Sequence, residues 1–248
     1  MRKVAIITGS SKGIGAATAI RLASDGYDVC VNYLSNENAA DEVALIAKSY
    51  GVNAISVKAD ISSETDVKQL FEKVGRELGN PYALVNNAGI LFRQSRVAEM
   101  SAERIDQVLK TNVTGYFLCC KEAIIRMSTK NGGHGGVIVN VSSAASRIGS
   151  GGEYVDYAAS KGAIDTLTLG LASEVAEEGI RVNGVRPGFI YTDIHKSGGE
   201  PNRVDRLKEI LPLKRGGQPE EVAAAISWLV SSESSYTTGS FIEVSGGR

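Results

Sequence analysis

Short runs of apolar, often β-branched residues alternate with longer amphipathic stretches from one end of the chain to the other. Each short run has the length and composition of a buried strand, and each longer stretch has apolar residues at helical spacing. This alternation predicts an α/β fold with a single doubly wound, Rossmann-type sheet, largely parallel and covered by helices on both faces. We expect its seven strands at residues 4–8, 28–32, 54–59, 83–86, 137–141, 181–185 and 241–244.

Boundary residues support these elements. Gly26 follows the first helical stretch, Ser63 with Asp66 resembles a capping box for the third, and Pro219 stands in the first turn of the last. Residues 188–217 are less regular, being polar and rich in Gly and Pro. We expect a mobile substrate loop there, with one or two short helices.

Composition narrows the class of protein. A chain of 248 residues with 43% hydrophobic content fits one large α/β domain over residues 1–248, and a net charge of −1 gives no basic field for nucleic acid. No apolar run approaches a membrane span, so we expect a soluble, cytoplasmic protein. Cys30, Cys119 and Cys120 lack metal-ligand spacing and are interpreted as core thiols, and we expect no metal site.

Tyr157 and Lys161 are the most informative pair of residues. Four residues apart, they project from one face of a helix, one turn from each other. A free phenol has a pKa of about 10, and a nearby ammonium lowers it, so the pair predicts a proton-transfer site. The alternative is a tyrosine ring packed beside a solvated lysine stem.

A glycine-rich segment follows the first strand, Thr8-Gly9-Ser10-Ser11-Lys12-Gly13-Ile14-Gly15, and leads into a helix. Glycines allow close approach to the backbone, and the unpaired N–H groups of a helix N-terminus attract negative charge. The segment therefore predicts a diphosphate site, with a plain tight turn as the alternative.

Three more motifs complete a recognisable order: Asn86-Asn87-Ala88-Gly89, Ser142-Ser143 and Pro187-Gly188, after the fourth, fifth and sixth strands. With these motifs the whole chain resembles the short-chain dehydrogenase/reductase family, and within it the bacterial glucose-dehydrogenase-like NAD(P)-dependent oxidoreductases. The Gly-x-x-x-Gly-x-Gly spacing of residues 9–15 is that of this family.

The resemblance implies catalytic roles. Tyr157 is expected to be the general acid/base, and Lys161 to lower its pKa and hold the nicotinamide ribose. Ser143 matches the carbonyl-orienting serine, with Ser142 as the competing assignment. Asn112 matches an asparagine that connects the lysine to solvent through water, although a purely structural role stays open.

The resemblance also implies the cofactor contacts. Asp60 is expected beside the adenine, and Ile190 and Thr192 beside the carboxamide, while Asn87 is open to a structural role. The full expected set is Gly9, Ser11, Lys12, Gly13, Ile14, Gly15, Asn32, Ser35, Asp60, Ile61, Asn87, Ala88, Gly89, Tyr157, Lys161, Pro187, Gly188, Ile190 and Thr192.

Cofactor preference follows from the end of the second strand. An NAD-selective enzyme normally has an acidic residue there, whereas this chain has Asn32. Lys12 matches a basic position that approaches a 2′-phosphate in relatives, and Ser35 offers a hydroxyl. We expect NADP(H) to be preferred, with measurable use of NAD(H).

The expected activity is reversible hydride transfer between NADP(H) and a small carbonyl or secondary alcohol, sugars and polyols included. The alternative enzyme is a 3-oxoacyl-carrier-protein reductase, which is disfavoured because this chain has Glu177-Glu178 where carrier-using relatives have a basic residue. The alternative from another class of protein is a non-catalytic NADP(H)-binding sensor. The resemblance implies a homotetramer with contacts at residues 241–244 and the preceding helix. Possible polar substrate contacts are Arg93, Glu153, Tyr154, Asp156, His195 and Arg203.

Overall fold

A seven-stranded sheet forms the centre of the computed structural model, which describes residues 2–248. The strand order is β3-β2-β1-β4-β5-β6-β7, and every neighbouring pair is parallel. The predicted fold class is therefore confirmed, with each strand boundary within two residues of its predicted place. The strands are β1 (Val4–Ile7), β2 (Asp28–Tyr33), β3 (Ala54–Lys58), β4 (Pro81–Asn86), β5 (Gly136–Val141), β6 (Ile180–Pro187) and β7 (Phe241–Val244).

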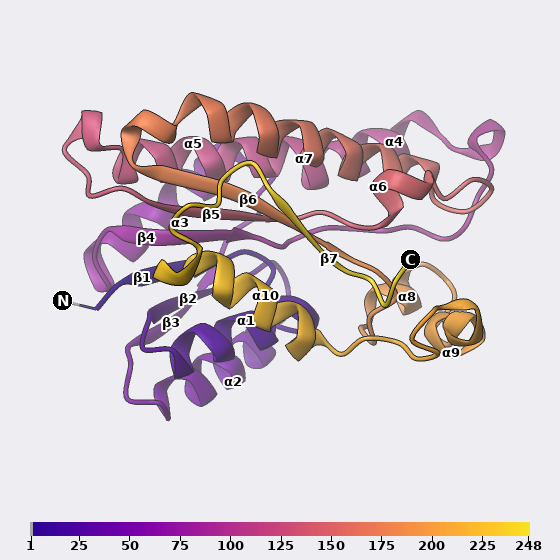
Figure 1. Cartoon of the computed structure of the whole chain (residues 1–248), viewed down its shortest axis with the longest axis horizontal. Coiled ribbons are helices and arrows are strands. Elements are labelled where there is room, and N and C mark those ends of the chain that lie inside the picture. Colours follow the sequence, from indigo (N-terminus) through magenta and orange to yellow (C-terminus); the bar gives the residue numbers. More distant parts are fainter. Residues whose placement is uncertain (1) are drawn as a thin grey trace.

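Helices cover both faces of the sheet (Figure 1). On one face, the apolar sides of α1 (Gly13–Ser24), α2 (Glu37–Lys48) and α10 (Pro219–Val230) pack on the strands and enclose one core. On the other face, α3 (Glu64–Glu77), α5 (Gly115–Met127) and α7 (Val155–Glu174) enclose a second core. Strands buried on both faces need nearly continuous apolar sequence, which explains the unbroken apolar runs.

The shorter helices lie mainly between these elements. Their bounds are η1 (Val97–Glu99), α4 (Ala102–Leu109), the π-helical turn η2 (Lys110–Thr114), η3 (Thr129–Asn131), α6 (Ala145–Ile148), η4 (Ala176–Glu178), α8 (Ile194–Ser197), α9 (Arg203–Leu207), η5 (Lys208–Ile210) and η6 (Ser232–Ser234).

The predicted boundary residues act as expected. The Ser63 hydroxyl accepts from the Asp66 N–H at the start of α3, and Gly26, with a φ of 89°, follows α1. Pro219 is the first residue of α10, whose capping box pairs Gln218 with Glu221. These local contacts fix where each helix begins, and so which residues reach the edge of the sheet.

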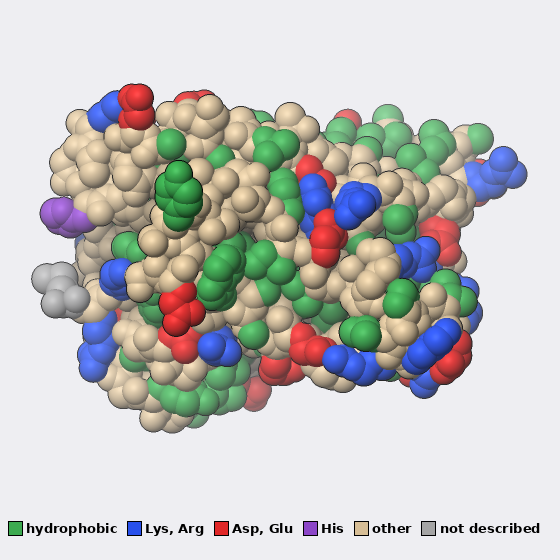
Figure 2. Space-filling model, in the orientation of Figure 1, with side chains coloured by type: hydrophobic (Ala, Val, Ile, Leu, Met, Phe, Trp, Pro, Cys, Tyr) green, Lys and Arg blue, Asp and Glu red, His purple; other side chains and the backbone are tan. Residues whose placement is uncertain are grey.

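The carboxyl ends of the strands meet at one edge, opposite the N-terminus in Figure 1. The chain runs outward through β2 and β3 and then returns to place β4 beside β1, which creates a crevice between the loops after β1 and β4. Residues 188–217 lie at this edge and include α8 and α9, so the predicted short helices are confirmed. Figure 2 shows acidic and basic side chains intermixed on one face of the molecule. Within residues 2–248, no helix has the length and apolar character to cross a bilayer.

Candidate active site

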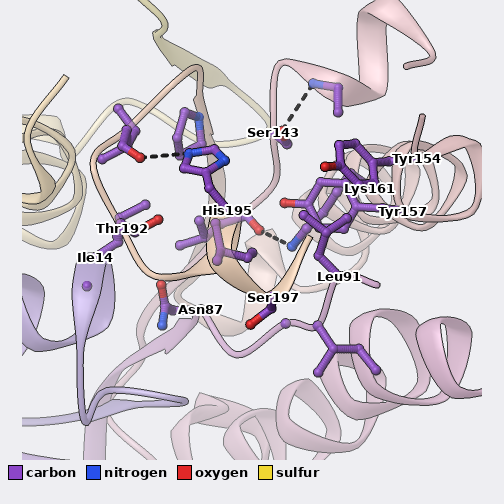
Figure 3. A pocket seen from close by; sticks show the side chains of 18 of the residues that line it. Ile14, Asn87, Leu91, Ser143, Tyr154, Tyr157, Lys161, Thr192, His195 and Ser197 are labelled. Atoms are coloured by element: carbon purple, nitrogen blue, oxygen red, sulfur yellow. Dashed lines mark hydrogen bonds between the residues drawn. The ribbon is translucent and has the colours of Figure 1, made fainter. Parts of the chain in front are cut away.

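A cavity of about 900 Å³ lies at the carboxyl edge of the sheet. Its lining includes Ser143, Tyr157 and Lys161 and, except for Gly15, every residue of the expected cofactor set. Gly15 and Asn112 lie behind this lining. In Figure 3, Ser143, Tyr157 and Lys161 lie on one side of the cavity, while Ile14 and Thr192 lie on the other. Sequence reasoning thus identified side chains that the fold brings together.

The glycine-rich turn is fastened to the segment after β4. The Thr8 hydroxyl accepts from the N–H groups of Asn87 and Ala88, at 2.9 and 3.1 Å. The Asn87 amide donates to the carbonyls of Thr8 and Gly9. A β-carbon at Gly9 would lie 2.8 Å from the Ala88 Cα, so only glycine permits this approach. Asn87 therefore has the structural role that the sequence left open.

The N-terminus of α1 faces the cavity beside this turn. Lys12 is its N-cap residue, and no side chain caps the first turn, which leaves N–H groups available to an anion. The Lys12 ammonium lies 3.5 Å from an Asp193 carboxylate oxygen, and both side chains are largely exposed. A β-carbon at Gly13 would lie 3.3 Å from the Thr192 Cγ2, so the 188–217 segment closes over the turn.

Asn32 lines the cavity, as predicted, and also has a structural role. Its side chain is buried, its Oδ1 accepts from the Gly9 N–H at 3.1 Å, and its Nδ2 donates to the carbonyls of Val57 and Ala59. The amide therefore braces the glycine-rich turn against β3, with its polar atoms committed to protein partners. Leu34 and Ser35 present their side chains to the cavity beyond it.

Asp60 lies in the turn after β3 and lines the same half of the cavity. Its Oδ1 accepts from the Ser62 N–H at 2.9 Å, and its own N–H donates to Asp66. The aspartate therefore shapes the turn that leads into α3 and also lines the cavity.

Tyr157 and Lys161 occupy successive turns of α7, as predicted. Lys161 is only 2% exposed; its ammonium donates to the Val141 carbonyl at 2.8 Å and to the Tyr116 hydroxyl at 3.2 Å. It lies 5.7 Å from the centre of the Tyr157 ring. The alternative of a solvated lysine stem is therefore wrong.

The expected lowering of the Tyr157 pKa is wrong for the protein on its own. Burial raises the pKa of Tyr157 to about 12, and the Ser143 hydroxyl opposes this through a hydrogen bond. Burial also lowers the pKa of Lys161 to about 7, against the charge of Asp165. The lysine is thus only partly charged at neutral pH and donates to Val141 and Tyr116, so it offers the phenolate less stabilisation than a full charge would.

The two serines after β5 differ in what their hydroxyls contact. Ser142 is buried, and its hydroxyl contacts the Asp165 carboxylate at 2.6 Å and the Lys161 carbonyl at 3.2 Å. The Ser143 hydroxyl accepts from the Ala145 N–H and contacts Tyr157, which leaves it placed to donate into the cavity. The geometry favours Ser143 as the carbonyl-orienting residue, with Ser142 fixing β5 to α7.

Asn112 lies in the π-helical turn η2 and is fully buried. Its amide accepts from the Ile90 N–H at 2.8 Å and donates to the Ile90 carbonyl and the Ser160 hydroxyl. A β-carbon at Gly89 would lie 3.4 Å from Asn112 and 3.7 Å from the Lys161 ammonium, so the asparagine borders the lysine through the glycine.

Two residues of this arrangement were not predicted from the sequence. Tyr116 accepts from Lys161 and donates to the Val141 carbonyl, and Asp165 holds Ser142 and Arg186. Tyr116 follows Asn112 by four residues, as Asp165 follows Lys161, so both spacings place a polar residue one helical turn from a predicted site residue.

The possible polar substrate contacts divide into two groups. Glu153, Tyr154, His195 and Arg203 line the cavity. Arg93 and Asp156 do not, and the Asp156 carboxylate instead pairs with Arg104 at 2.8 Å. Both are therefore removed from the set of substrate contacts.

Comparisons with known proteins agree with this geometry. Residues 9–248 match the family model described as "Enoyl-(Acyl carrier protein) reductase". The chain is 61% identical to "Uncharacterized oxidoreductase YgfF" of Escherichia coli strain K12, over 99% of each chain. It is 43% identical to "Glucose 1-dehydrogenase 2" of Bacillus subtilis strain 168, over 99% of this chain and 94% of that one. A crystal structure of a short-chain type dehydrogenase/reductase from Mycobacterium marinum is similar with a TM-score of 0.92 at 33% identity, over 99% of this chain and 94% of that one. The chain therefore belongs to the short-chain dehydrogenase/reductase family of oxidoreductases.

Proposed function

We propose that this oxidoreductase transfers hydride between NADP(H) and a small carbonyl or secondary alcohol. One observation carries the proposal. Ser143, Tyr157 and Lys161 line one side of a cavity whose opposite wall includes the uncapped N-terminus of α1. A carbonyl between these walls would have two hydroxyl donors on its oxygen and a bound cofactor facing its carbon.

The residues present fit a nicotinamide dinucleotide. The glycine-rich turn and the free N–H groups of α1 would hold the diphosphate, and Asp60, Ile190 and Thr192 line the channel on either side. The dinucleotide supplies or accepts the hydride. Lys12 would favour the 2′-phosphate of NADP(H), and Asn32 carries no negative charge that would repel this phosphate. Its pairing with Asp193 offsets part of that charge, so NAD(H) should also be used.

In the reduction, the Tyr157 hydroxyl would donate its proton to the carbonyl oxygen while Ser143 donates a second hydrogen bond. A phenol whose pKa is about 12 stays protonated at neutral pH, which suits it to the role of proton donor. Lys161 would bind the ribose of the cofactor and, in the oxidation, favour the phenolate.

Tyr157→Phe tests the assignment because it removes only the hydroxyl. Turnover of a panel of carbonyls, sugars and polyols should fall by about 10² to 10⁴-fold while NADPH affinity is retained. Tyr236→Phe, at a fully exposed tyrosine, is the control and should match wild type. Turnover of Tyr157→Phe within about threefold of wild type would overturn the role of Tyr157, since general acid/base help is far larger than that.

The matching family model, described as an enoyl-acyl-carrier-protein reductase, favours one second candidate, a reductase of carrier-linked substrates. An acidic carrier needs a basic docking surface. Here Glu178 forms an ion pair with Lys130, so the two charges offset each other and the repulsion we expected depends on Glu177. We therefore rank free substrates first. Cofactor binding without turnover of either substrate class would instead favour a sensor.

We further propose a cytoplasmic homotetramer, with β7 and α10 among its contact surfaces. Trp228 on α10 is 38% exposed, and Phe241 on β7 is only partly buried, so both present apolar area that a subunit contact would cover. Sedimentation of the purified protein tests the assembly.

A further inference from the structure

Several polar side chains around the substrate half of the cavity are bonded to other protein groups. Arg203 forms ion pairs with Glu153 and Glu200 and is itself buried. The Tyr154 hydroxyl donates to the Gly198 carbonyl at 3.1 Å, and the His195 Nε2 contacts the Ile190 carbonyl at 2.9 Å. The other ring nitrogen of His195, Nδ1, is buried and has no hydrogen-bond partner among the described residues.

Apart from Arg248, a substrate with many hydroxyl groups would therefore find few charged side chains free to pair with it in this half of the cavity. Each hydroxyl that enters the cavity loses its bonds to water, and an unpaired buried hydroxyl costs about 1–3 kcal/mol. Ser143 and Tyr157 are directed at the reacting oxygen. Of the other lining hydroxyls with no protein hydrogen bond within residues 2–248, Ser11, Ser35 and Thr192 belong to segments expected to hold the cofactor, which leaves Thr111, Ser150 and Ser197. The Arg248 guanidinium also lines the cavity and lies 5.0 Å from the centre of the Phe189 ring.

Apolar side chains form much of the remaining surface. Leu91, Phe92 and Leu207 line this half of the cavity, and Ile148 and Ile210 extend it outward. The last two are 47% and 64% exposed, although isoleucine is usually buried. They come from separate elements, α6 and η5, and belong to the same lining as Tyr157. Figure 3 shows Leu91 on the Tyr157 side of the cavity.

We propose that the substrate carries an apolar alkyl or aryl substituent beside its reacting carbonyl, which Ile148 and Ile210 cover, and that it is not a sugar or polyol. This inference rests on the proposed function and names its substrate class. The substituent would remove both isoleucines from water while leaving the Arg203 ion pairs intact.

A chain-length series of methyl ketones, from butanone to octanone, tests the inference. Each methylene that the cavity buries should raise kcat/KM by about fourfold, until the chain extends beyond the isoleucines. Hydroxyacetone and glucose, in reduction and oxidation respectively, represent the polar class and should be poor substrates. A flat dependence on chain length, or a preference for the polar compounds, would overturn the proposal.

Variants locate the effect. Ile148→Ser and Ile210→Ser should each lower kcat/KM for octanone by about tenfold and kcat/KM for butanone much less, because only the longer chain reaches them. Leu213→Ser is the matched control, since Leu213 follows η5, is 62% exposed and does not line the cavity. An equal loss in the control would contradict the assignment, and cofactor affinity in all three should stay at the wild-type value.

A binding measurement separates this inference from the proposed function. Primary carboxamides of the same chain lengths present a carbonyl that is not reduced, and their affinity for the NADPH-bound protein can be followed by cofactor fluorescence. Affinity that rises with chain length supports the apolar site even if no ketone is turned over, an outcome that would count against the proposed function alone. Comparing a free ketone with the same acyl chain on a carrier protein distinguishes the two sources of such a chain.

Discussion

Substituting alanine at Gly9 tests whether the close approach of the glycine-rich turn to Ala88 positions the cofactor site. Gly9 has a φ of 59°, and an added β-carbon would lie 2.8 Å from the Ala88 Cα. The left-handed backbone alone costs alanine about 1–2 kcal/mol, and the lower entropy of the unfolded chain returns about 0.4–1 kcal/mol. Overpacking adds about 1–3 kcal/mol. We therefore expect Gly9→Ala to lower the free energy of unfolding by roughly 2.5 kcal/mol.

Gly51 provides the control because its φ is 79° and, apart from its chain neighbours, no atom of residues 2–248 lies within 4 Å of the position of an added β-carbon. Gly51→Ala should carry the backbone cost alone, so its melting temperature should fall by about 3 °C, against about 5–10 °C for Gly9→Ala. Differential scanning calorimetry measures both. The dissociation constant of NADPH should rise at least about tenfold in Gly9→Ala only. Equal melting temperatures for the two variants, or wild-type affinity in Gly9→Ala, would refute the reasoning.

Three further predictions concern charged residues. Lys12→Ala should raise KM for NADP severalfold more than KM for NAD. Asp193→Asn should instead lower KM for NADP relative to KM for NAD, because it frees the Lys12 ammonium. Equal changes for both cofactors would show that Lys12 does not contact the phosphate. Carrier-linked acyl substrates should be used less well than free carbonyls because Glu177 repels an acidic carrier, and a competition assay that favours the carrier-linked form would contradict this. Lys161→Met should be most stable relative to wild type below about pH 7, and this advantage should shrink as the pH rises to 10.5. The reason is that wild type alone gains stability when the buried lysine loses its proton. A difference in melting temperature that does not depend on pH would count against a low pKa of Lys161.

Features set by local sequence could be predicted. The strands follow from their apolar runs because both faces of the sheet are covered. The position of Tyr157 relative to Lys161 follows from helix geometry, and the docking of residues 9–15 at the sheet edge follows from a glycine-rich turn between a strand and a helix. For these, neighbours in the sequence hold the necessary information.

Features that depend on partners far away in the sequence could not be predicted. Asn32 stands at a position that selects the cofactor in the family, but its side-chain amide forms hydrogen bonds to Gly9 and to the backbone at β3. The low pKa of Lys161 arises from burial beneath segments far away in the sequence, against which the spacing to Tyr157 is a weak guide. The commitment of Arg203 to Glu153 also depends on how residues 188–217 fold back.

The parallel order of the sheet has a consequence for the chain as it is synthesised. β1 pairs with β4, and β6 gains its outer neighbour only when β7 has emerged more than fifty residues later. Glu243 on β7 also accepts from Arg186, which holds the Asp165 carboxylate that contacts Ser142. A nascent chain therefore exposes the edge of β6, and with it an aggregation-prone surface, until β7 leaves the ribosome. Slow elongation between β6 and β7 would prolong that exposure, and early chaperone contact would shorten it.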